Sequence, residues 1–209
     1  MMPFHSFPLQ ITPSSGMTGE VIPYLLRTDW LITGILFLCL VLTSYAFSKG
    51  KTYLLQQLKS FFSTRERASL FDDVTATDIR YSFVLIVQTC VLLALYLYHY
   101  FTFASPQLFS TTSHLLILFL LFCAVIGYLT VKWILFYIVN QTFFSPTQNS
   151  LWMSAYWDVI IWTGFLFFPV IMLAVYFDMS AQNSLLLAAF VVLNMKILLF
   201  YRCFRNFFK

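Results

Sequence analysis

The sequence predicts an all-α fold, a polytopic bundle of five membrane-spanning helices with an interfacial amphipathic helix. Two observations carry this prediction. The chain of 209 residues is 60% hydrophobic, 20% aromatic and only 10% charged, whereas soluble domains contain about 25% charged residues. No Lys, Arg, Asp or Glu occurs between Tyr81 and Val131, and that run holds two helices of the roughly 20 apolar residues that a bilayer core requires.

The chain divides into five segments. Residues 1–29 form a polar tail, which lacks the basic start of a cleaved signal peptide. The first span covers residues 30–48, a polar loop covers residues 49–80, and residues 81–201 hold a bundle of four further spans. A basic tail, residues 202–209, ends the chain. We place the four later spans at 81–104, 113–139, 151–177 and 183–201.

The basic residues predict the orientation of these spans. Only Arg27 lies on the side of the N-terminal tail, whereas nine basic residues lie in the loop or after the fifth span. These nine are Lys49, Lys51, Lys59, Arg65, Arg67, Arg80, Arg202, Arg205 and Lys209. By the positive-inside rule, the loop and the C-terminus are cytoplasmic and the N-terminal tail is outside.

The polar loop contains a predicted amphipathic helix. Apolar residues recur at helical spacing from Leu54 to Phe62, with polar residues between them. Because Lys49 and Lys51 lie just before this segment, it suits a helix in the headgroup plane. A helix that packs under the bundle and touches little lipid is the alternative.

A charged cluster follows that helix in the loop. Arg65, Glu66 and Arg67 are adjacent in the sequence, and they are candidates for a cytoplasmic surface on which a partner protein docks. An internally salt-bridged turn is the alternative.

Lys132 and Asp158 are the charged residues inside the third and fourth spans. A polar turn at 141–150 is expected between these spans, with Lys132 fourteen positions before Pro146 and Asp158 twelve after it. An antiparallel hairpin brings both to similar depth, and an isolated charge there costs roughly 2.5–3.5 kcal/mol. We therefore expect Lys132 to contact Asp158, with Lys196 of the fifth span as the second candidate. Such a pair is either structural or a proton-handling site.

His99 and His114 are the candidates for a metal or haem site. They lie near the outer ends of the second and third spans, and their rings would face a shared ion if the two helix ends meet. Two interfacial amphipathic side chains are the alternative. No HExxH, GxSxG, GxGxxG or P-loop motif is present, and the four cysteines lack CxxC spacing. We therefore expect no catalytic residues and no cofactor, with haem as the alternative.

Two groups of residues carry a family resemblance. The first is the segment Arg65–Phe71 with Asp78–Arg80, at the end of the loop. The second consists of Lys132, the segment Asn140–Phe144, Trp152, Tyr156, Gly164, Phe168 and Pro169. Over about residues 50–200 the chain resembles a family of uncharacterised multi-spanning inner-membrane proteins from Bacteroidota. The resemblance implies a location in the bacterial inner membrane and carries over no catalytic role.

Two classes of function remain. We favour a non-enzymatic accessory or scaffold subunit of a cell-envelope assembly, because the chain is short and lacks catalytic motifs. Its partners would be the lipid bilayer and other membrane or envelope proteins. Nucleic acid is not expected, since the basic residues behind the net charge of +4 flank apolar spans. The alternative is a small transport or redox protein that uses His99/His114 or Lys132/Asp158, although no inverted repeat is visible.

The orientation can be tested by cysteine labelling in intact cells. A cysteine introduced at Ser14 should react with a membrane-impermeant maleimide, and one at Ser63 should be protected until the membrane is permeabilised. The parent protein gives the background from its native cysteines. Protection at Ser14 together with labelling at Ser63 would reverse the predicted orientation.

Overall fold

The chain is all-helical in the part that the computed structural model describes, residues 26–62, 76–105, 109, 112–177 and 179–207. A single 3₁₀ turn, Leu26–Thr28, precedes five α-helices in these ranges. The helices are α1 (Trp30–Phe62), α2 (Ala76–Ala104), α4 (His114–Phe143), α5 (Pro146–Tyr176) and α6 (Ala181–Phe207). Each contains a stretch long and apolar enough to cross a membrane. The prediction of an all-α bundle with five candidate spans is confirmed.

The predicted amphipathic segment does not form a helix of its own. It continues α1, which runs without a break from Trp30 to Phe62. Leu54 is buried and packs with Ala46 of the same helix, Leu85 of α2 and Ile161 of α5. This contact favours the alternative in which the segment packs under the bundle. Side chains 56–62, and with them most of the apolar face of the segment, lie outside the described residues.

The turn between α4 and α5 is much shorter than the ten residues expected. Only Phe144 and Ser145 separate the two helices. Ser145 is the N-cap of α5, its hydroxyl accepts a hydrogen bond from the Gln148 N–H, and the Gln148 side chain accepts one from the Ser145 N–H. Pro146 therefore begins a helix instead of occupying a loop, because the first helical position needs no N–H donor.

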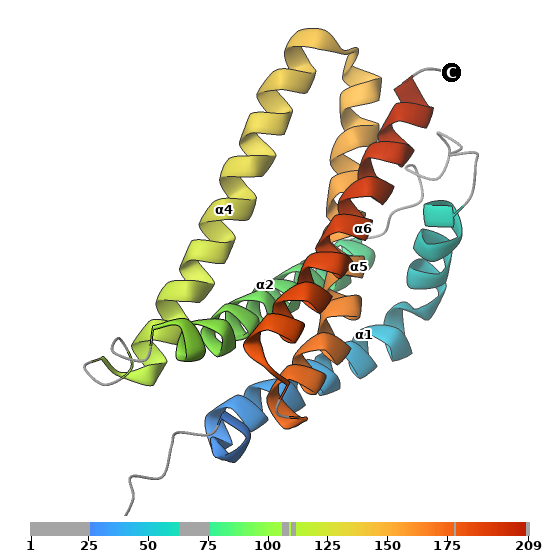
Figure 1. Ribbon diagram of the computed structural model, residues 1–209. Helices are drawn as coiled ribbons and strands as arrows, with labels where there is room; N and C mark the ends of the chain where they lie inside the picture. The colour runs from blue at the N-terminus through green and yellow to red at the C-terminus, as the bar shows by residue number, and fades with distance from the viewer. Residues whose placement is uncertain (1–25, 63–75, 106–108, 110–111, 178, 208–209) are drawn as a thin grey trace, which may run out of the picture.

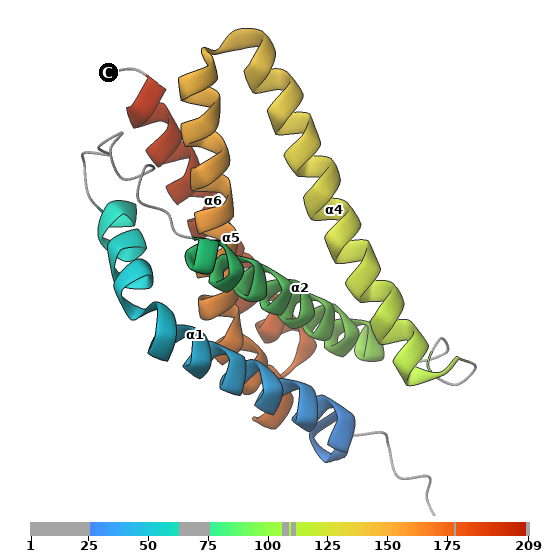
Figure 2. The same ribbon diagram turned by 180° about the vertical axis from the view of Figure 1, so that it is seen from behind.

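The helices surround a central pair, α2 and α5. Helix α5 packs on α2 and α6, and α1 packs on α2. Half of the most apolar stretch of α2 and of α5 is buried, compared with 6% for α4. Helix α4 contacts mainly α2. Both views show that, below the turn that joins it to α5, helix α4 leans away from α5 and α6 (Figures 1 and 2).

The two central helices come unusually close at one point. Gly164 of α5 lies against Thr89 of α2, and a Cβ on Gly164 would stand 2.0 Å from the Thr89 hydroxyl oxygen. That hydroxyl donates a hydrogen bond to the Leu85 carbonyl, 2.8 Å away, so its position is held by its own helix. Small residues allow such an approach of two helix backbones within a membrane. A larger residue at position 164 would therefore force Thr89 or the two helices to move.

Substitution of this glycine should separate the central helices. Gly164→Ala is expected to lower the free energy of unfolding by roughly 1–3 kcal/mol, since the added methyl group overpacks the contact with Thr89. Unfolding by sodium dodecyl sulfate in mixed micelles, followed by circular dichroism, measures this change.

Gly127→Ala on α4 is the matched control. No atom lies within 4 Å of the place its Cβ would occupy, and alanine favours a helix over glycine by roughly 0.5–1 kcal/mol. The control should therefore be neutral or stabilising. Equal stability of the two variants would contradict the close approach of α2 and α5.

Candidate functional site

The charged residues of the later spans gather in the halves of α4, α5 and α6 that lead to the short α4–α5 turn and to the end of α6. Four of them concern the site: Lys132 on α4, Asp158 on α5, and Lys196 and Arg202 on α6. They form two arrangements, an ion pair and a cavity, which lie on different sides of α5.

The ion pair joins α5 to α6. Arg202 Nη1 lies 3.4 Å from Asp158 Oδ2, and the two side chains are 4% and 14% exposed. The sequence placed Arg202 in a basic tail, but α6 continues to Phe207 and carries this guanidinium into the bundle. The cation that meets Asp158 is therefore neither Lys132 nor Lys196, the two expected candidates, but a residue that had been assigned to the tail.

The geometry of α5 explains why Asp158 does not meet Lys132. Tyr156 faces α4, because its hydroxyl donates a hydrogen bond to the Leu129 carbonyl at 3.2 Å. Asp158 follows two residues later, about 200° around the helix axis, and therefore faces α6. Within the described part of the chain, Asp158 forms an ion pair with Arg202, whereas the expected partner was Lys132.

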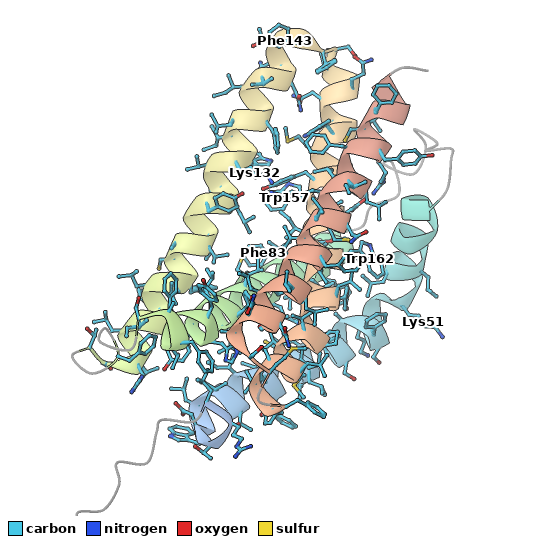
Figure 3. All side chains as sticks on the ribbon, viewed as in Figure 1. Lys51, Phe83, Lys132, Phe143, Trp157 and Trp162 are labelled. Atoms are coloured by element: carbon cyan, nitrogen blue, oxygen red, sulfur yellow. The ribbon has the colours of Figure 1, made fainter. Side chains whose placement is uncertain are left out.

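Lys132 lies instead among aromatic rings. Its ammonium is 5.6 Å from the ring centre of Phe136, 5.8 Å from that of Tyr156 and 6.0 Å from that of Tyr128. Figure 3 shows the side chain in the space between α4 and α5, on the same side as Trp157. Cations within about 6 Å of a ring centre are attracted by the negative face of the ring. The rings therefore offset part of the free energy needed to place the Lys132 ammonium in an apolar environment.

Lys132 also lines a cavity together with Lys196, the second charge expected near the pair. The cavity measures about 200 Å³ and is bounded by α2, α4, α5 and α6. Apart from the two lysines its lining is mostly apolar, and no lining residue is acidic. The other lining residues are Thr89, Leu93, Tyr128, Leu129, Tyr156, Val159, Ile160, Thr163, Val192, Met195 and Leu199. We call this space the dilysine cavity.

The two histidines are placed near the junction of α2 and α4, but they do not face each other as a ligand pair would. The Tyr98 hydroxyl lies 2.9 Å from His114 Nδ1, so Tyr98 and not His99 meets His114. His99 is buried, with its ring against Phe103. In the described part of the chain, no group of three or more His, Cys, Asp or Glu side chains could hold a metal ion.

The third group of candidates, Arg65, Glu66 and Arg67, lies outside the described residues. The two features that sequence reasoning missed are Arg202 and the dilysine cavity. A signal for Arg202 was present in the apolar residues that continue past Tyr201, Cys203 and Phe204. The sequence contains no comparable signal for the cavity, because the cavity depends on the rotation of each helix about its axis.

Comparison with protein families gives a match over most of the chain. The model of a domain of unknown function, DUF4271, matches residues 32–209. The chain belongs to the DUF4271 family. The match includes nearly all of α1 and the whole of α2, α4, α5 and α6, so the residues of the ion pair and of the dilysine cavity all lie within the matched region. Neither the curated proteins nor the solved structures give a match to the chain.

A double-mutant cycle on this DUF4271 protein distinguishes the two possible partners of Asp158. Asp158→Ala should lower the free energy of unfolding, because it leaves the buried Arg202 charge without this carboxylate. The double variant with Asp158→Ala and Arg202→Ala should lose less free energy of unfolding than the sum of the losses in the two single variants. The difference, the coupling energy, should be roughly 0.5–3 kcal/mol.

The same cycle with Lys132→Ala in place of Arg202→Ala serves as the comparison. Its coupling to Asp158 should be clearly smaller, since Lys132 lies among rings on the opposite side of α5. A larger coupling for Lys132 than for Arg202, measured by the same detergent unfolding, would overturn this assignment.

Proposed function

We propose that this DUF4271 protein is a non-enzymatic accessory or scaffold subunit of a cell-envelope assembly. It would lie in the bacterial inner membrane, with the N-terminal tail outside and the C-terminus in the cytoplasm. In this role α4 is the helix against which a transmembrane helix of another protein packs. The observation that carries the proposal is the exposure of α4, whose candidate span is the most apolar of the five described and only 6% buried.

The composition of the outer face of α4 supports a protein partner. Gly127 lies four residues after Cys123 and three after Ala124, Thr130 lies three after Gly127, and all four residues are exposed. In the described part of the bundle, nothing lies within 4 Å of a Cβ on Gly127, so no close contact there requires a glycine. Small residues let a second helix approach closely, whereas contact with lipid chains is made equally well by large apolar side chains.

The positions of the charged residues also favour a structural role over transport. Asp158 is paired with Arg202, and Lys132 contacts three aromatic rings. The alternative function, transport or redox chemistry with haem or a metal, relied on His99 with His114 or on Lys132 with Asp158. Since Tyr98 meets His114 and Arg202 meets Asp158, we rank this alternative second.

Site-specific photo-crosslinking in intact cells tests the proposal. Benzoylphenylalanine at position 127 should give a discrete cross-linked product with another membrane protein, which mass spectrometry can identify. The matched control is position 34 on α1, where the native glycine is also exposed and also has no atom within 4 Å of a Cβ. The control should give no discrete product.

A second change establishes that packing against α4 is specific. Ala124→Leu fills the groove of small residues and should remove the product at position 127 while leaving expression and membrane insertion unchanged. Cross-links to lipid alone at both positions would contradict the scaffold role. A product that contains two copies of this chain would replace the proposed assembly with a homo-oligomer.

A further inference from the structure

The dilysine cavity holds two positive charges that no carboxylate in its lining neutralises. Lys132 and Lys196 line the same space, and no acidic side chain lines it. The nearest carboxylate along α5, that of Asp158, is paired with Arg202. Two like charges therefore face one apolar space, where repulsion is stronger than in water. An anion placed between the two ammonium groups would remove this repulsion.

The two lysines also lie at the same level of the bundle. Lys132 is eleven residues before the last residue of α4, and Lys196 is eleven before the last residue of α6. Both helices run in the same direction, toward the end of the molecule that holds the α4–α5 turn and the C-terminus (Figure 1). At 1.5 Å per residue the Cα of each lysine is roughly 16 Å from the end of its helix. The ammonium group lies closer to the interface when the lysine side chain extends toward it.

The surroundings of the cavity are apolar on both sides. On α4 the neighbouring side chains of Val131 and Leu135 are exposed, and on α6 those of Leu193 and Ile197 are exposed. A ligand that fits has a compact negative group for the two lysines and long apolar chains for these faces. A soluble anion matches only the first of these features, whereas an anionic lipid matches both.

We infer that the dilysine cavity binds the phosphate headgroup of an anionic membrane lipid between Lys132 and Lys196. The acyl chains lie along the exposed apolar faces of α4 and α6. Basic pockets between transmembrane helices on the cytoplasmic side bind anionic headgroups in this manner. The three rings around the Lys132 ammonium hold it toward the cavity. The lining of the cavity does not include the small residues of α4 on which the proposed function relies.

Lipid titration of the purified full-length protein tests the inference. The protein is delipidated in a neutral detergent and titrated with phosphatidylglycerol or phosphatidylcholine whose chains are brominated, with quenching of its tryptophan fluorescence as the signal. Phosphatidylglycerol should bind more tightly than phosphatidylcholine. Lys132→Gln and Lys196→Gln should each weaken phosphatidylglycerol binding about fivefold, the factor expected for one basic residue near an anionic headgroup.

Three controls make the test decisive. Lys49→Gln removes an exposed lysine at the end of the candidate span of α1 and should leave the affinity unchanged. Lys132→Arg and Lys196→Arg keep the charge and should retain the preference for phosphatidylglycerol. Inorganic phosphate at millimolar concentration should not displace the lipid. If Lys132→Gln fails to fold, Lys196→Gln carries the test, since the Lys196 side chain is exposed.

Three results would overturn the inference. The first is equal affinity for the two lipids in the wild-type protein. The second is the same loss of affinity with Lys49→Gln as with the two cavity variants, which would indicate general surface attraction. The third is displacement by inorganic phosphate, which would identify the cavity as a site for a free anion and not for a lipid.

Discussion

The close approach of α2 and α5 at Thr89 and Gly164 is the contact on which the positions of the other helices depend. Helix α1 packs on α2, α6 packs on α5, and α4 reaches across to α2. A wider separation at Gly164 would move both partners of the Asp158–Arg202 pair and two walls of the dilysine cavity, because Thr89 itself lines that cavity. One glycine thus links the packing of the bundle to the geometry of its charges.

The charges of the later spans are accommodated in three physically different ways. Arg202 is nearly inaccessible and is satisfied by an ion pair across α5 and α6. Lys132 is partly buried and has aromatic rings in place of a counter-ion. Lys196 is exposed and faces the cavity. Of these three charges, only that of Arg202 is neutralised by a carboxylate within the described chain. Lys132 and Lys196 both line the dilysine cavity, which has no acidic residue in its lining.

The sequence predicted the number and approximate limits of the spans, because a run of about 20 apolar residues has a direct physical meaning in a bilayer. It did not predict the partners of the charges. Depth along a helix can be counted from the sequence, but rotation about the helix axis cannot, and two positions decide whether a residue of α5 faces α4, as Tyr156 does, or α6, as Asp158 does. Pro146 misled for a related reason, since proline is compatible with both a turn and the first position of a helix.

The two-residue connection between α4 and α5 has a consequence for how the cavity acquires a ligand. Helix α4 is joined at one end to α5 by only Phe144 and Ser145, and at the other end it meets α2 through the contact of His114 with Tyr98. A helix anchored at both ends keeps the spacing of Lys132 and Lys196 before anything binds. We therefore expect recognition of the lock-and-key kind, in which little conformational entropy is lost on association and the affinity depends on how well the ligand's shape matches a preorganised opening.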